Sequence, residues 1–150
     1  MMLALRQIEA DQALLQLGQR LRADGYRFTC VTPATHARVN AREGCGQAST
    51  LRDVFGWSRP FDPGLLSADQ LQLLERAQAL VAQGELLTST VRWSSLDEFL
   101  LLHSAFPTDT SDAVFFGPDS YRFAQVIHEH LQHCPARVEH AVDIGCGSGV

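Results

Sequence analysis

The sequence contains no lysine: all 12 of its basic residues are arginines, set against 17 acidic residues, and the formal net charge is −5. This net acidity argues against indiscriminate binding to DNA, whose phosphates attract cationic surfaces. No run of apolar residues approaches the ~20 that span a bilayer. The first residues lack the long apolar segment of a secretory signal. We therefore expect a cytoplasmic protein with no membrane association.

Cysteine is sparse and has no pattern. The four cysteines, at positions 30, 45, 134 and 146, form no C-x-x-C pair. In a cytoplasmic chain this favours free thiols over a disulfide framework. Low-complexity tracts are absent too, and 45% hydrophobic with 19% charged residues is typical of a globular protein. The composition therefore predicts a folded domain with its own core.

The most informative stretch is AVDIGCGSGV at residues 141–150. An apolar run is followed by glycine at every second position, which predicts a buried strand that turns sharply into a helix. Glycine lets the backbone bend tightly and lets a ligand approach it, while the helix N-terminus offers unpaired N–H groups. A dinucleotide-binding G-x-G-x-x-G motif requires a glycine where Val150 stands, which disfavours an NAD-type site.

The motif resembles the first motif of class I S-adenosylmethionine-dependent methyltransferases, because an acid stands two residues before the first glycine. In such enzymes the loop lies along the methionine half of the cofactor, and the acid helps to hold its ammonium group. The resemblance implies S-adenosylmethionine as cofactor and binding roles for Asp143, Gly145, Gly147 and Gly149. The alternative is a glycine-rich turn after an unrelated strand, or a flexible tail.

A second segment, VFFGPDSY at residues 114–121, supports the same family. It precedes a predicted helix that carries an apolar stripe and stops at Pro135. The segment looks like the one before the first helix of release-factor glutamine methyltransferases and related small-domain methyltransferases. There the hydroxyl residue sits beside the cofactor, which implies such a role for Ser120. Ser120 is equally suited to capping the helix, and one residue can do both.

The resemblance covers residues 114–150. The Asn-Pro-Pro-Tyr segment that holds the acceptor nitrogen in this group is missing, and no Asn-Pro pair occurs. We therefore expect the N-terminal portion of a methyltransferase with a truncated catalytic domain, no catalytic residue of its own and no activity by itself. The resemblance implies that the intact enzyme transfers a methyl group directly to a nitrogen of a protein glutamine or an RNA base.

The first half of the chain shows mainly helical patterns. A period of 3.6 residues predicts a helix over residues 3–24. Thr32 as N-cap and a proline after it open a second helix over residues 34–43. Ser49 or Thr50 caps a short third helix.

The pattern then changes from helix to strand. Ser67 and Gln70 form a capping box, which predicts a helix that ends at Gly84. Residues 86–93 predict one or two short strands, and residues 99–102 a strand or a buried helical turn. Helices followed by a small hairpin indicate a winged-helix-like module.

The predicted fold class is therefore α+β, mainly helical, in two parts. Residues 1–105 form a winged-helix-like accessory domain. A polar loop over residues 106–112 is the expected boundary. Residues 106–150 supply the linker, a short apolar strand at 113–116, and the first helix and strand of a Rossmann-like methyltransferase domain. A non-catalytic winged-helix module that binds nucleic acid or protein is the competing hypothesis.

Positive charge gathers between residues 20 and 59, where seven arginines face three acids for a net charge of +4. A solvated helical face explains this most simply, but a basic segment can also dock a nucleic acid. We name Arg38, Arg42 and Arg52 as candidate docking residues for RNA or a ribosome-associated protein.

Two other clusters invite functional interpretations. The stretch from His128 to Gln132 lacks the second histidine of H-E-x-x-H, so we expect no metal site there. His103 and Ser104, with Asp109 or Asp112, have the residue types of a hydrolytic triad, but no G-x-S-x-G motif surrounds the serine. A local hydrogen bond is the expected role of that pair.

Overall fold

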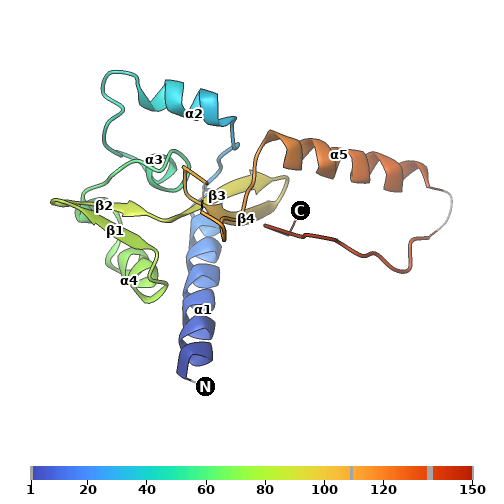
Figure 1. Cartoon of the computed structure of the whole chain (residues 1–150), viewed down its shortest axis with the longest axis horizontal. Helices are drawn as coiled ribbons and strands as arrows, with labels where there is room; N and C mark the ends of the chain where they lie inside the picture. Colours follow the sequence, from blue (N-terminus) through green and yellow to red (C-terminus); the bar gives the residue numbers. More distant parts are fainter. Residues whose placement is uncertain (1, 109, 135–136, 150) are drawn as a thin grey trace.

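The structure is a computed structural model that describes residues 2–108, 110–134 and 137–149. It is a mixed α+β fold, 43% helical and 15% strand, with two small antiparallel sheets, which confirms the predicted class. None of the helices in these residues is both long and apolar enough to cross a bilayer. The elements, in order, are α1 (Met2–Ala23), α2 (Pro33–Asn40), α3 (Leu51–Phe55), the 3-10 turn η1 (Pro63–Leu65), α4 (Ala68–Arg76), β1 (Leu80–Gln83), β2 (Leu86–Ser89), β3 (Val91–Leu96), β4 (Phe99–Ser104) and α5 (Pro118–His133) (Figure 1).

The starts of α2, α3 and α4 are as predicted. The Thr32 side chain caps α2, and α3 begins with a capping box between Thr50 and Asp53. The predicted capping box of Ser67 and Gln70 opens α4. Each cap satisfies backbone N–H groups that have no partner within the helix. The helix ends are less well predicted, since α2 stops at Asn40 and not at residue 43.

The prediction that the fourth helix runs to Gly84 is wrong. The helix ends at Arg76, and Gln78 adopts a left-handed conformation with φ +54°. The next residues form β1, which pairs with β2 in a hairpin whose register aligns Leu80 with Ser89. Gly84, with φ +64°, belongs to the turn of this hairpin. The glycine therefore marks the turn of a hairpin and not the end of a helix.

The second sheet consists of β3 and β4, paired over their whole length from Val91 with Ser104 to Leu96 with Phe99. Residues 99–102, for which the sequence predicts a strand or a buried helical turn, thus form a strand. An isolated bridge between Phe61 and Leu87 adds a short third edge to the first hairpin.

Trp93 of β3 lies at the centre of the core, 2% exposed. Its ring meets the Phe55 ring edge-on at 5.4 Å, and its carbonyl accepts a hydrogen bond from the Tyr26 hydroxyl at 3.0 Å. On α1, a Cβ at Gly18 would lie 3.0 Å from the Trp93 indole nitrogen. The ring therefore joins α1, α3 and β3, as expected of a core tryptophan.

Two predicted strands are wrong for this chain. Residues 113–116 are irregular, held to the end of β4 by a bond from the Ser104 N–H to the Val114 carbonyl at 3.0 Å. Residues 141–144 are also irregular, and Val142 and Ile144 are 86% and 93% exposed. A parallel strand needs hydrogen-bonding neighbours, and the described residues offer none beside this one. The predicted helix stop at Pro135 and the last residue of the glycine motif, Val150, lie outside the described residues.

We expect Gly56→Ala to destabilise the fold. A Cβ at this position would lie 2.3 Å from Cδ2 of Phe28 and 2.7 Å from the Arg52 carbonyl oxygen. Overpacking of this kind costs about 1–3 kcal/mol. Gly46→Ala is the matched control, because its Cβ would meet nothing within 4 Å. Urea denaturation of both variants checks the prediction, and equal midpoints would contradict it.

Candidate functional site

The predicted cofactor turn has the backbone that its glycines imply. Gly145, Gly147 and Gly149 have φ values of +77°, +50° and +77°. These values lie in the left-handed region that side chains disfavour. The Gly149 N–H donates to the Cys146 carbonyl at 2.7 Å, which closes the turn. A Cβ at Gly145 or Gly149 would meet nothing within 4 Å, so the backbone conformation, and not crowding, requires glycine there.

The turn is open to solvent. Asp143 and the residues around it are exposed. Among the described residues, no hydrogen bond or ion pair joins the turn to another element. The structure therefore shapes the predicted cofactor loop but does not bring it together with Ser120 or with the arginines.

Ser120 lies in the first turn of α5. The helix N-cap is Gly117, so the expectation that Ser120 caps the helix is wrong in position. Ser120 instead reaches back: its hydroxyl accepts from the Gly117 N–H at 3.4 Å, while its own N–H donates to the Gly117 carbonyl at 3.0 Å. A Cβ at Gly117 would lie 2.6 Å from the tip of the Phe115 ring, so a side chain there would displace that exposed ring.

The start of α5 is fixed to the first part of the chain by three residues, which we call the Cys30 anchor: Cys30, Phe116 and Tyr121. The Cys30 thiol donates to the Phe116 carbonyl at 3.1 Å, and the Cys30 N–H donates to the Tyr121 hydroxyl at 2.9 Å. The Phe116 ring packs edge-on against Tyr121 at 5.0 Å and is 3% exposed. Residues on both sides of the predicted 106–112 boundary thus share one core.

A buried arginine stands behind the anchor. Arg92 of β3 is 4% exposed, and its Nη2 donates to the Cys30 sulfur at 3.0 Å. No carboxylate among the described residues forms an ion pair with it. A cavity of about 20 Å³ lies beside it, lined also by His36, and within the described residues the Arg92 Nε and His36 Nε2 have no hydrogen-bond partner. That volume is about the size of one water molecule, which is too small for a substrate.

His103 and Ser94 form a second buried pair. The Ser94 hydroxyl lies 2.8 Å from His103 Nε2, and His103 Nδ1 lies 3.2 Å from the Ser104 carbonyl oxygen. Since only a donor suits that carbonyl, Nδ1 carries the proton and Nε2 accepts from Ser94. Both side chains are buried, so a substrate cannot reach them. The predicted local hydrogen bond of His103 is confirmed with the Ser104 main chain, whereas the Ser104 hydroxyl accepts from the Val114 N–H at 2.9 Å. Asp109 lies outside the described residues.

Burial and the Arg92 charge keep two histidines neutral. Burial, followed by the Arg92 charge, lowers the pKa of His103 to about 3. The same two causes, in the same order, lower the pKa of His36 to about 4.

These pKa values predict acid sensitivity. Below pH 6.5 the two histidines bind more protons in the unfolded chain than in the folded one. The stability of the fold therefore does not depend on their titration above that pH, and it decreases as the pH falls toward their folded pKa values of about 4 and 3. Each histidine lowers the free energy of unfolding by up to ~1.4 kcal/mol per pH unit. His36→Gln should make the loss of stability between pH 7 and 5 shallower, whereas His140→Gln, at an exposed position, should not. Denaturation at a series of pH values tests this, and a flat profile for the parent chain contradicts it.

Two of the three histidines of α5 form hydrogen bonds within their helix. His128 Nε2 lies 2.6 Å from the Gln132 amide nitrogen, and His133 Nδ1 lies 2.7 Å from the Glu129 carbonyl oxygen. In the part of the chain that the structure describes, no three His, Cys, Asp or Glu side chains gather as a metal site would require.

The candidate docking arginines lie on different elements. Arg38 lies on α2 and Arg42 follows that helix, both exposed. Arg52 lies on α3 and shares a groove of about 410 Å³ with Arg27. Arg27 was not among the candidates, because 25 residues separate it from Arg52 and nothing local in the sequence joins them.

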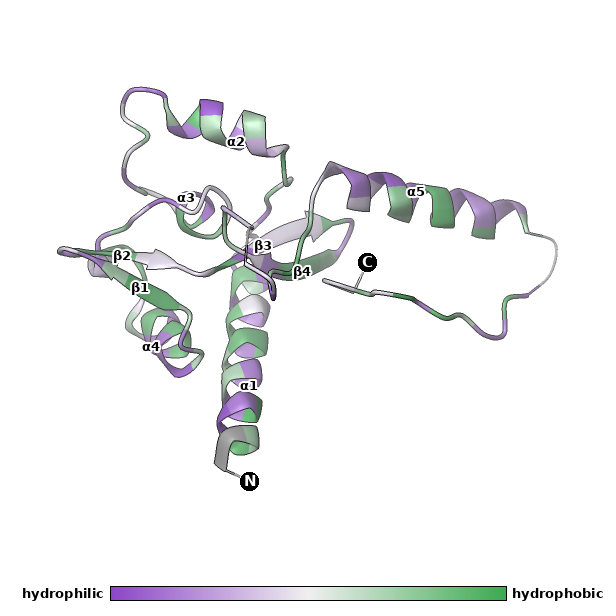
Figure 2. Ribbon diagram, in the orientation of Figure 1, coloured by the Kyte–Doolittle hydropathy of each residue, from purple (hydrophilic) through white to green (hydrophobic). Residues whose placement is uncertain are grey.

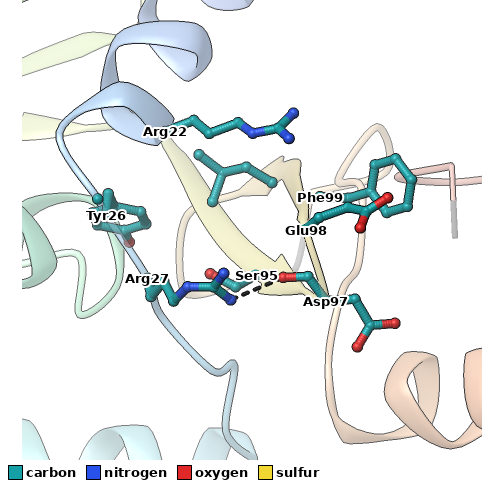
Figure 3. A pocket seen from close by; sticks show the side chains of 9 residues that line it. Arg22, Tyr26, Arg27, Ser95, Asp97, Glu98 and Phe99 are labelled. Carbon is teal, nitrogen blue, oxygen red and sulfur yellow. Dashed lines mark hydrogen bonds between the residues drawn. The ribbon is translucent and has the colours of Figure 1, made fainter.

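On the other side of Arg27 lies a smaller cavity of about 210 Å³ (Figure 3). The close view shows Arg27 bonded to the backbone of Asp97, with Arg22 at the opposite edge and the Glu98 and Asp97 carboxylates nearby. The charges around this cavity largely cancel. The 410 Å³ groove has no carboxylate in its lining.

Comparison with models of protein families and with curated proteins finds no match for this chain. The assignment of function therefore depends on the residues and their geometry.

We expect Tyr121→Phe to loosen the Cys30 anchor selectively. The variant leaves the Cys30 N–H without its acceptor, which costs about 1–3 kcal/mol. Hydrogen exchange should accelerate at residues 113–121 more than at β3. Tyr26→Phe is the matched control, since its hydroxyl bonds to Trp93 in the main core and its loss should weaken the whole fold. Equal acceleration in both variants would contradict a selective anchor.

Proposed function

We propose that this chain forms the N-terminal portion of a class I S-adenosylmethionine-dependent methyltransferase. The observation that carries the proposal is the turn after Asp143, where all three glycines adopt left-handed backbone. A side chain would strain the backbone at each of these positions, and the absence of a Cβ also lets a ligand approach the backbone closely. Asp143 and the three glycines would hold the methionine half of the cofactor.

The exposed apolar stripe of α5 supports the proposal that this helix packs against a sheet in the intact enzyme. Phe123, Val126 and Leu131 are 54%, 62% and 50% exposed, and Val142 and Ile144 beyond the helix are more exposed still. Figure 2 shows these hydrophobic stretches on α5 and along the following tail. Exposed apolar side chains on a helix and on a strand-like segment suit the first α and β layers of a Rossmann-like domain.

The Cys30 anchor gives the first part of the chain a role in this proposal. It fixes the start of α5, and with it Ser120, against β3 and the segment before α2. In a methyltransferase this arrangement would place the accessory part of the chain at the cofactor site, with the Ser120 hydroxyl beside the cofactor.

The finer architecture of the first part is also a proposal. The order of α3, α4 and the β1–β2 hairpin suits a winged-helix-like module. We further propose a cytoplasmic location, in keeping with the free thiols of the chain.

The bound cofactor would supply an electrophilic methyl group on its sulfonium. The chain's own residues would bind and orient it, and the acceptor would be a nitrogen of a protein glutamine or of an RNA base. Catalysis of this kind depends on orientation and charge placement, so the described residues need no nucleophile. We expect residues 1–150 alone to be inactive.

The test is binding of S-adenosylhomocysteine, measured by calorimetry on the protein made from its full coding region. Asp143→Asn should weaken binding about 10–100-fold, the usual loss for a hydrogen bond to a charged group. Glu139→Gln, at a nearby exposed acid, should leave the affinity unchanged. No binding, or equal losses in both variants, would overturn the proposal and favour the non-catalytic module.

A further inference from the structure

We propose that the groove between Arg27 and Arg52 binds the phosphodiester backbone of a single-stranded nucleic acid. Its lining combines two guanidinium groups, two hydroxyl groups and two aromatic rings, and contains no carboxylate. The residues are Arg27, Phe28, Thr29, Arg52, Trp57 and Ser95. We call this surface the arginine groove.

Both arginines of the groove are held in place without being neutralised. Arg52 Nε donates to the Arg27 carbonyl at 3.1 Å, and Arg27 Nη1 donates to the Asp97 carbonyl at 2.9 Å. A carbonyl fixes the direction of a guanidinium but leaves its positive charge and its remaining N–H groups available. Guanidinium groups present N–H donors in the planar geometry that matches phosphate oxygens.

Two other arginines of the basic segment differ in this respect. Arg20 forms an ion pair with Asp69 at 2.7 Å, and Arg59 forms one with the buried Asp53. Their charges are thus used within the fold. Among the described residues, Arg27 and Arg52 both line the arginine groove, and neither forms an ion pair.

The aromatic wall favours a single strand. Trp57 is half-buried and its ring is held edge-on by Phe28 at 5.2 Å. The Arg59 guanidinium lies 5.9 Å from the centroid of this ring and the His36 ring lies 5.6 Å from it, so only the exposed part of Trp57 is open to the groove. That part can contact an unstacked base, which a double helix does not offer. The wall thus distinguishes the groove from a simple anion site.

The floor of the groove supplies a further donor. The Ser95 N–H donates to the Phe28 carbonyl at 2.8 Å, and the Ser95 hydroxyl accepts from the Phe28 N–H at 3.1 Å. The hydroxyl proton of Ser95 and the hydroxyl of the exposed Thr29 remain as donors toward a phosphate. Beyond Arg27, the Asp97 and Glu98 carboxylates repel phosphate, so the bound nucleic acid runs from Arg27 toward Trp57.

This inference does not depend on the methyltransferase proposal. The arginine groove belongs entirely to residues 27–95, and its test needs neither the glycine turn nor a cofactor. Failure of S-adenosylhomocysteine binding would leave the groove unaffected, and failure of the groove would leave the cofactor turn unaffected.

The experiment titrates residues 1–150 with a fluorescein-labelled oligouridine 12-mer at several salt concentrations. Two phosphate contacts predict a slope of log K against log salt of about −1.4. Arg27→Gln/Arg52→Gln should abolish this slope and weaken binding at least about 10-fold at low salt. Because Trp93 is buried, quenching of tryptophan emission reports Trp57 and should accompany binding by the parent chain. A duplex of equal length should bind more weakly.

The matched control is Arg6→Gln/Arg76→Gln, which removes the same charge at two exposed positions outside the groove. It should retain the parent affinity. Arg27→Lys/Arg52→Lys keeps both positive charges and should retain the dependence of log K on log salt. This variant therefore separates loss of the charges from disruption of the fold by substitution at these positions. The proposal is overturned if the two double-glutamine variants weaken binding equally, or if the double-lysine variant loses the salt dependence. It is also overturned if inorganic phosphate or heparin displaces the oligonucleotide and the Trp57 emission does not change.

Discussion

The buried carboxylate of Asp53 is the group on which the corner between α2 and α3 depends. It accepts from the backbone N–H groups of Ser49 and Thr50 at 3.2 and 3.1 Å and forms an ion pair with Arg59. Burial alone raises the pKa of Asp53, but the hydrogen bonds from Thr50 and Ser49, with the Arg59 charge, outweigh it and hold the pKa below its usual value. A five-residue helix has no stability by itself, so these bonds define α3.

The same network sets the shape of the arginine groove. Arg59 Nε donates to the Asn40 side-chain oxygen, and the Asn40 amide donates to the Trp57 carbonyl, both at 2.9 Å. Asp53 therefore fixes, through one charge, the helix that carries Arg52 and the backbone that carries Trp57. The proposed binding surface thus depends on a buried ion pair, whose two partners cannot be lost separately without leaving a charge unpaired in the interior.

The sequence predicted what local chemistry determines. The caps at Thr32 and Ser67 depend on residues three positions away, and the left-handed glycine turn depends on the glycines alone. Elements that depend on distant partners were missed or misplaced. The end of α4 is set by the β1–β2 pairing, the groove joins Arg27 to Arg52, and the anchor joins Cys30 to Tyr121 across 91 residues. The helical spacing of apolar residues continues by coincidence through Leu80, and it contains no information about the pairing of β1 with β2.

The extended segment between α1 and α2 connects the two proposed sites. Tyr26, Phe28 and Cys30 are buried, while Arg27 and Thr29 between them are exposed, the alternation of a strand with one face on the core. Its outer face lines the arginine groove and its inner face ends in the Cys30 anchor, which holds the start of α5. A nucleic acid bound along the outer face would therefore lie one residue away from the backbone that positions Ser120. The two surfaces are separated in sequence, but a single stretch of main chain fixes the position of both.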